Sequence, residues 1–431
     1  MQFKQYPSYK NSGVEWLGDV PEHWGVNRLG VHFKNRKEKV SDKDFKPLSV
    51  TKHGIVPQLE HAAKSDNGDN RKLVRKGDYV INSRSDRKGS SGLADLDGSV
   101  SLINIVLTPF KTIHPKFSHY LLRSYLFQEE FYKYGHGIVA DLWTTNYEDM
   151  RNIHLALPSV SEQTQISNFL EQETTRIDTL IAKQEKLIEL LEEQRKSIIS
   201  HAVTKGLNPN APMKDSGVEW LGKVPNDWNL SRLDAVSKIV RGNSAFSKMD
   251  LLESGEYVAL QYGKTYKVNI INESFDFYVN HEFFKNSQIA EFGDTVLIST
   301  SETLEDLGHS CFYARHDLGL IGGEQFLLKP KNQTFGKYIY YATKAFSSYL
   351  QRYATGLKVF RFNLDDLKKI YIPDISLVEQ QKIAEFLDKE TARIDISVLK
   401  QKSLIEKLKE YRASIISHAV TGKIDVREFG A

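Results

Sequence analysis

Two loops of this chain carry side chains that can bind nucleic acid. In the first half, four such residues follow a predicted strand that ends near residue 81: Arg84, Ser85, Arg87 and Lys88. Arginine and lysine can bind phosphate or donate to guanine, and serine can donate to phosphate oxygens. For any one of these residues, a solvated basic loop is the simpler interpretation.

The second half has a corresponding strand near residues 293–297, and Thr300 and Ser301 follow it. Hydroxyl groups at this place can contact phosphates or bases. With further basic residues from predicted loops, the candidate nucleic-acid-binding set is Lys52, Arg84, Ser85, Arg87, Lys88, Lys264, Thr300, Ser301, Lys358 and Arg361.

The common signatures of catalysis are missing. The chain has no His-Glu-x-x-His helix, no Gly-x-x-x-x-Gly-Lys-Ser/Thr loop and no Gly-x-Gly-x-x-Gly turn. His309 and His316 flank Cys311 at spacings unlike those of known zinc sites. We therefore predict no catalytic residue and no metal site. Two competing interpretations stay open: an enzyme with unrecognised active-site geometry, and a coiled-coil scaffold that binds no DNA.

Composition sets the class of protein. The 431 residues are 40% hydrophobic and 26% charged, which predicts two or more globular units. A single cysteine excludes an intramolecular disulfide and fits a reducing compartment. No apolar run reaches the roughly 20 residues that span a bilayer, and the first residues do not resemble a signal peptide. We expect a cytoplasmic protein without membrane contact. The net charge of +3 does not by itself indicate nucleic acid.

The elements that must position these loops are written twice in the sequence. The heptapeptide SGVEWLG occurs at residues 12–18 and 216–222, and Val-Pro-x-x-Trp occurs at 20–24 and 224–228. SIISHAVT occurs at 197–204 and 414–421. Between these ends only a skeleton recurs, such as Gly-Asp at 77–78 and 293–294, and Asn146 with Asn363. The chain is therefore a domain-scale duplication, which suits a target with two half-sites.

Two long helices are predicted, because neither proline nor glycine occurs in 162–204 or 379–421. Heptad spacing supports coiled-coil seams. The first seam has Ile166, Leu180 and Leu187 in one row and Leu170, Ile177, Leu191 and Ile198 in the other. The second has Ile383 and Leu404 in one row and Leu387, Ile394, Leu408 and Ile415 in the other.

A glutamine interrupts each seam near its middle, at Gln184 and Gln401. If the helices pair antiparallel, the two glutamines could meet and fix the register. An exposed position in the seam explains them equally well. The pair of helices could hold two half-sites a fixed distance apart, bind separate partners, or serve as a simple dimerisation coiled coil.

The variable middles read as strands followed by helices. Short apolar runs at 79–81 and 100–107 predict strands, and the spacing of Phe117 to Phe131 and of Tyr338 to Leu350 predicts helices. The fold class is therefore α+β. We expect two mixed α/β domains that are related by a pseudo-two-fold axis and separated by the two long coiled-coil helices. Four segments are predicted. They are a first domain with its opening segment (1–157), the first long helix (158–204), a linker with the second domain (205–373), and the second long helix with a tail (374–431).

The twin openings, the twin helix ends and the Glu-Gln pairs at 162–163 and 379–380 resemble the type I restriction-modification specificity subunit family. The resemblance covers nearly the whole chain. It implies a non-catalytic subunit with two target-recognition domains, each reading one half of a bipartite site in double-stranded DNA, and an antiparallel spacer that sets the gap. It also implies two methyltransferase subunits that bind S-adenosylmethionine, which this chain would not bind, and restriction or translocase subunits.

Overall fold

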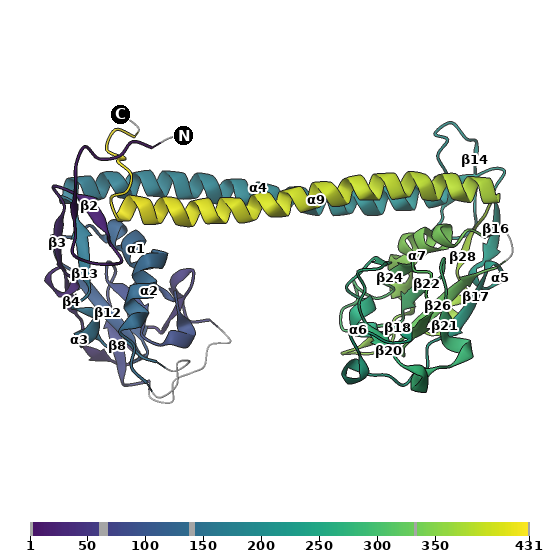
Figure 1. Cartoon of the computed structure of the whole chain (residues 1–431), viewed down its shortest axis with the longest axis horizontal. Helices are drawn as coiled ribbons and strands as arrows, with labels where there is room; N and C mark the ends of the chain where they lie inside the picture. Colours follow the sequence, from purple (N-terminus) through teal and green to yellow (C-terminus); the bar gives the residue numbers. More distant parts are fainter. Residues whose placement is uncertain (1–2, 60–67, 138–142, 332–333, 430–431) are drawn as a thin grey trace. The chain divides into compact units, whose positions relative to one another are not determined.

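The chain divides into two compact units. The computed structural model describes residues 3–59, 68–137, 143–331 and 334–429. Unit 1 comprises residues 1–185 and 402–431, and unit 2 comprises residues 186–401 (Figure 1). The long helices α4 (Val160–Lys205) and α9 (Leu377–Val420) therefore contribute residues to both units. The predicted domain bounds follow the sequence repeat and stay a prediction.

Unit 1 is built on a four-stranded sheet of order β10-β9-β12-β4 and a three-stranded sheet of order β11-β8-β5. Two-stranded ladders β1-β2, β3-β13 and β6-β7 complete it. The strands are β1 (Tyr9–Asn11), β2 (Asp19–Pro21), β3 (Gly25–Arg28), β4 (Phe33–Asn35), β5 (Lys39–Val40), β6 (Leu48–Thr51), β7 (Gly54–Pro57), β8 (Arg71–Val74), β9 (Tyr79–Asn82), β10 (Ser91–Leu93), β11 (Gly98–Val100), β12 (Asn104–Pro109) and β13 (His154–Leu157). The short helices are α1 (Pro115–Arg123), α2 (Tyr125–Lys133) and α3 (Tyr147–Met150).

Unit 2 has a five-stranded sheet of order β17-β26-β22-β24-β19 and a four-stranded sheet of order β20-β18-β25-β21. The ladders β14-β15, β16-β28 and β23-β27 accompany them. The strands are β14 (Met213–Asp215), β15 (Lys223–Pro225), β16 (Asn229–Arg232), β17 (Ser237–Arg241), β18 (Tyr257–Leu260), β19 (Ile270–Ile271), β20 (Tyr278–Val279), β21 (Ile289–Ala290), β22 (Thr295–Ile298), β23 (Thr300–Ser301), β24 (Ser310–Tyr313), β25 (Gly319–Ile321), β26 (Gln325–Pro330), β27 (Phe360–Arg361) and β28 (Tyr371–Asp374). The helices are α5 (Leu233–Val236), α6 (Tyr262–Thr265), α7 (Gly336–Leu350) and α8 (Leu364–Leu367).

The predicted α+β class and the mixture of strands and helices in both middles are confirmed, with two local corrections. The predicted strand at 100–107 is two strands, β11 and β12, separated by a turn. The predicted helix from Phe117 to Phe131 is also two elements. Ser124 has extended backbone and ends α1, and its hydroxyl caps α2 by accepting from the Phe127 N–H at 3.4 Å.

The recurring Gly-Asp pair forms the same turn in both units. Gly77 and Gly293 have φ values of 93° and 95°, which a side chain would oppose. The carboxylates that follow close the turns: Asp78 accepts from the Arg75 N–H at 2.8 Å, and Asp294 accepts from the Glu291 N–H at 2.9 Å. Burial raises the pKa of Asp294 to about 6. These turns lead into the central strands β9 and β22. The Gly-Asp pair therefore recurs because both sheets require the same turn at this place.

Within each unit, α4 and α9 run antiparallel. In unit 1, Arg412 Nε donates to Asp178 Oδ1 at 2.8 Å, and farther along Phe429 meets Phe169 with ring centroids 4.6 Å apart. In unit 2, Arg195 pairs with Asp395. The two ion pairs are equivalent in the repeat, since Asp395 and Arg412 each lie 217 positions (395 − 178) after Asp178 and Arg195. The predicted antiparallel pairing is confirmed within each unit.

One predicted row of each seam is wrong in part. Ile166 and Ile383 of these rows are fully buried, as predicted. Leu187 and Leu404 are 39% and 40% exposed, and their neighbours Ile188 and Ile405 are the ones turned inward. Leu187 and Leu404 lie three residues after Gln184 and Gln401, whereas the inward-facing Ile188 and Ile405 lie four residues after them. Both spacings fit one helix equally well, and only the partner helix chooses between them. Gln184 and Gln401 are half-buried, and their role in register stays a prediction.

The repeated openings clamp the starts of the long helices. In unit 1, Trp24 Nε1 donates to Glu162 Oε1 at 3.1 Å. In unit 2, Trp228 Nε1 donates to Glu379 Oε1 at the same distance. The Val-Pro-x-x-Trp and Glu-Gln motifs therefore recur together because they are the two sides of one hydrogen bond.

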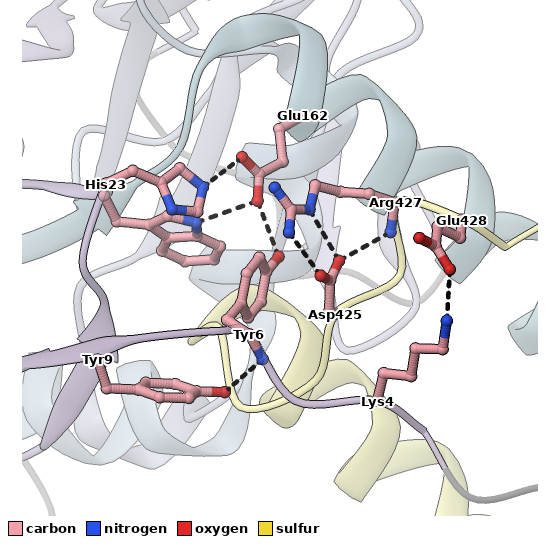
Figure 2. A network of polar contacts seen from close by, with 9 residues as sticks. Lys4, Tyr6, Tyr9, His23, Glu162, Asp425, Arg427 and Glu428 are labelled. Carbon is pink, nitrogen blue, oxygen red and sulfur yellow. Dashed lines mark hydrogen bonds and ion pairs between the residues drawn. The ribbon is translucent and has the colours of Figure 1, made fainter.

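The clamp of unit 1 is the larger one (Figure 2). Glu162 also accepts from the Tyr6 hydroxyl at 2.8 Å and lies 2.8 Å from His23 Nε2. The Arg427 guanidinium lies 4.9 Å from the centre of the Tyr6 ring and is paired with Asp425. The tail after α9 thus joins the opening segment to the start of α4.

Each opening segment is also held by the end of a long helix. Lys423 donates to the carbonyl oxygens of Leu17 and Asp19 in unit 1. Lys205 donates to those of Leu221 and Lys223 in unit 2.

Among the described residues, no helix combines the length and apolar character needed to cross a membrane.

Candidate nucleic-acid interface

The loop after β9 lies beside the segment that precedes α3. Arg84 forms an antiparallel bridge with Thr144, and the Ser85 N–H donates to the Trp143 carbonyl at 2.8 Å. Arg84 Nε lies 3.3 Å from Asp86 Oδ1. The predicted loop therefore presents an arginine–carboxylate pair at the end of a central strand.

The other basic residues of this loop also have acidic neighbours. Arg87 is 67% exposed, with Nε at 3.6 Å from Asp86 Oδ2, and Lys88 pairs with Glu129. Exposed pairs of this kind contribute little stability and can exchange their partners for phosphate oxygens. Their role in DNA binding stays a prediction.

A basic groove in unit 1 brings together two predicted residues that are distant in sequence. Lys52 and Lys88 line a hollow of about 690 Å³. Arg123, at the end of α1, and Arg412, on α9, line the same hollow. We call these four residues the basic groove. Arg84, Ser85 and Arg87 lie outside its lining.

The charge of the basic groove comes from its lysines and arginines. His119 also lines it, but burial and the nearby Arg123 lower the pKa of this imidazole to about 4. It is therefore neutral near pH 7. Arg412 is paired with Asp178 and Lys88 with Glu129, so Lys52 and Arg123 supply the net positive charge.

Sequence reasoning missed Arg123 and Arg412 because both lie on helices, whereas the search took basic residues in predicted loops. The sequence repeat does contain a signal for Arg412, because this residue is the equivalent of Arg195 in the second copy. It indicates a side chain with the same place in both copies, although it does not indicate a groove.

In unit 2, the equivalent loops meet in the same way. Strand β23 pairs with β27, so that Thr300 lies opposite Arg361. These two residues line a hollow of about 300 Å³ together with Arg241 and Glu324. The structure thus brings Thr300 and Arg361 together, although 61 positions (361 − 300) separate them in the sequence.

The remaining candidates of unit 2 lie elsewhere. Ser301 is 2% exposed, and its hydroxyl accepts from the Thr303 N–H at 3.2 Å, which gives it a place in a turn. Lys264 lies over the Phe277 ring at 4.0 Å. Lys358 is exposed near the tip of the hairpin that Thr355 and Arg361 close.

Asn146 and Asn363 explain why these loops stop where they do. Asn146 caps α3 by accepting from the Asp149 N–H at 3.0 Å. Asn363 caps α8 by accepting from the Asp365 N–H at 2.9 Å and the Asp366 N–H at 3.1 Å. The recurring asparagine is a helix cap directly after each candidate loop.

Comparisons with known proteins agree with this construction. The family described as type I restriction modification DNA specificity domain matches residues 225–407. The putative type I restriction enzyme MjaX specificity subunit of Methanocaldococcus jannaschii is 26% identical over 457 aligned positions, which cover 99% of both chains. The EcoKI specificity subunit of Escherichia coli K12 is 25% identical over 210 positions, 47% of this chain and 44% of the relative.

Two solved structures share the fold. One, from work on complex assembly and conformational transition of the type I restriction-modification system, has a TM-score of 0.70 at 17% identity and covers 93% of this chain and 98% of its own. The specificity subunit of Thermoanaerobacter tengcongensis has a TM-score of 0.54 at 18% identity and covers 94% and 98%.

Two units of strands and helices that share two long helices are the fold that this chain has in common with these structures. Residues 225–407 match the type I restriction modification DNA specificity domain family, and the whole chain is similar to a type I restriction enzyme specificity subunit. The resemblance read from the twin motifs is confirmed, and so is the prediction of a specificity subunit in place of an enzyme.

Proposed function

We propose that this chain reads a DNA site made of two separate short sequences, one with the loops of each unit, and that the paired helices set the number of base pairs between them. The observation that carries the proposal is a contrast. The clamps at Trp24 and Trp228 are copied between the units, whereas the loops at Arg84 and Thr300 differ in residue type. Two like scaffolds with unlike loops suit two different half-sites.

The partners follow from the family. Relatives are named specificity subunits of type I restriction enzymes, which supports a complex of this chain with modification and restriction subunits. The repeat gives the chain two equivalent halves, and we propose two methyltransferase subunits, one on each half. S-adenosylmethionine would bind in those subunits, and a restriction or translocase subunit would join them. Such a complex would work in the cytoplasm, where the DNA lies.

The test is genome-wide mapping of N6-methyladenine in cells that carry this chain with its neighbouring methyltransferase, compared with cells that lack this chain. We expect a bipartite methylated motif that disappears with the chain. An unchanged pattern, with the methyltransferase shown to be expressed and active, would reject the function.

A chimera separates the two readers. Replacing residues 30–157 with the corresponding part of a relative keeps the clamp at Trp24 and the helices. We expect one half-site to change while the other half-site and the gap remain. A chimera that keeps both half-sites would contradict the assignment of one reader to each unit.

A further inference from the structure

The hollow of unit 2 contains an unusual carboxylate. Glu324 ends the turn Gly322-Gly323-Glu324 between β25 and β26, and its side chain lines the hollow with Thr300 and Arg361. Its φ of 63° is the sole positive value at a non-glycine position in the described part of the chain. The two preceding residues are glycines, and a third glycine at position 324 would adopt this φ at lower cost than glutamate does. A side chain kept in such a conformation is held by its surroundings, and this points to a function.

One contact holds the Glu324 carboxylate and another holds its backbone. The Thr300 hydroxyl donates to Glu324 Oε2, and the Ser299 N–H donates to the Glu324 carbonyl at 3.1 Å. The side chain nevertheless stays 48% exposed. Its second oxygen is therefore available to a donor that enters the hollow.

Arg361 completes a donor–acceptor pair. Its Nε lies 3.8 Å from Glu324 Oε2, which is beyond hydrogen-bond length, and its side chain is 61% exposed. Backbone hydrogen bonds with Thr355 in both directions, each 2.9 Å, fix the hairpin that carries Arg361. An acceptor held by Thr300 and a donor on a fixed backbone thus line one hollow side by side.

This arrangement selects its ligand by charge and geometry. A phosphate oxygen would be repelled by the Glu324 carboxylate, so the pair does not suit the DNA backbone. In the major groove, a C·G pair presents the N4 amino donor of cytosine beside the O6 and N7 acceptors of guanine. A carboxylate accepts from the first, and an arginine donates to the second.

We propose that Glu324 and Arg361 read one C·G pair within the half-site recognised by unit 2. Glu324 accepts a hydrogen bond from the cytosine N4 amino group, and Arg361 donates to guanine. This inference rests on the proposed function. In unit 1 the arginine–carboxylate pair is Arg84 and Asp86, both from one loop, so the two units present their pairs from different elements.

The test is selection of bound duplexes from a randomised library by the purified full-length chain, followed by sequencing. The variants are Glu324→Gly, which removes the carboxylate while glycine readily adopts the same φ, and Arg361→Gln. The control is Glu302→Gln, an exposed carboxylate that follows β23 and lies outside the lining of the hollow. The buried Cys311 thiol, left unreactive in each variant, shows that unit 2 is folded.

We expect both variants to lose preference for one and the same C·G pair. The loss should be about tenfold to hundredfold for Arg361→Gln, since a bidentate arginine–guanine contact discriminates by roughly that factor, and smaller for Glu324→Gly, which removes a single hydrogen bond. The other half-site and the control should keep their preferences. Preferences unchanged at every position, loss spread over the whole half-site, or an A·T pair at the affected position would each overturn the assignment. A wild-type chain that selects no bipartite site would instead defeat the proposed function, because that result does not depend on Glu324.

Discussion

The unequal clamps on the two long helices give a prediction in which the chain supplies its own control. Replacing Glu162 by alanine removes the acceptor of two buried donors, the Tyr6 hydroxyl and the Trp24 indole N–H, and of the more exposed His23. Replacing Glu379 removes the acceptor of the Trp228 indole alone among the side chains described here. The two substitutions are chemically identical and occupy equivalent positions of the repeat, so their difference isolates the extra contacts of unit 1.

The magnitude follows from the number of donors left unpaired. A buried donor without an acceptor costs about 1–3 kcal/mol. Glu162→Ala should therefore destabilise the opening segment of unit 1 by about 2–6 kcal/mol, and Glu379→Ala should destabilise that of unit 2 by about 1–3 kcal/mol. The expected difference of about 1–3 kcal/mol corresponds to roughly 5-fold to 150-fold in an opening equilibrium.

Hydrogen exchange measured by mass spectrometry is the suitable assay, because global unfolding of a two-unit chain is not a two-state process. Peptides from residues 6–24 and 213–228 report the two opening segments separately. We expect Glu162→Ala to lower protection in the first peptide by the larger factor and to leave the second unchanged. Equal losses in the two variants, or a larger loss for Glu379→Ala, would refute the reasoning that the additional donors stabilise unit 1.

Three further predictions concern single side chains. Cys311 is fully buried and burial raises its pKa to about 12, so a thiol reagent should label the native chain only when unit 2 unfolds in urea; rapid labelling of the native chain would contradict this. Burial holds the folded-state pKa of His119 near 4, below its ordinary 6.5, so the unfolded chain takes up the proton first as the pH falls. Stability of unit 1 should then be lost from pH 6.5 toward pH 4 by up to about 1.4 kcal/mol per pH unit, and His119→Gln should make urea unfolding less acid-sensitive. If the basic groove binds phosphates, Lys52→Gln and Lys88→Gln should each lower the magnitude of the slope of log K for DNA binding against log salt concentration by about 0.9. The control Lys111→Gln, at an exposed lysine outside the groove, should leave this slope unchanged.

The sequence predicted those parts of the fold that depend on local chemistry. The helices expected at 162–204 and 379–421 are observed at Val160–Lys205 and Leu377–Val420, because the absence of proline and glycine is a local property. The Gly-Asp turns and the asparagine caps are local as well. Their recurrence in the two copies therefore predicted equivalent structure correctly.

Features that need a partner surface were not predictable in this way. Which hydrophobic row of a helix faces its partner depends on the neighbouring helix, and Leu187 was assigned to the wrong row for that reason. The hollow around Glu324 joins residues from β23, β27 and a turn, and no pattern along the chain links them. The conformation of Glu324 is likewise imposed by tertiary contacts against its own preference.

The sequence repeat and the compact unit are different divisions of this chain, and the contacts of the helix ends explain why. Lys205 ends the helix of the first copy, yet it binds the opening segment of the second copy, at Leu221 and Lys223. Lys423 follows the helix of the second copy and binds the opening segment of the first, at Leu17 and Asp19.

Each unit is thus completed by the helix end of the other copy. The close fit of these ends argues that the completion is structural: a Cβ at Gly422 would lie 2.3 Å from Pro21 and 3.3 Å from Trp24, and the φ of 73° there favours glycine as well. The nearly copied motifs at the ends of the repeat are therefore the two surfaces of one recurring contact. A change on either surface affects the other, which keeps both copies alike. The loops at Arg84 and Thr300 lie outside this contact and can diverge with the DNA that each unit reads.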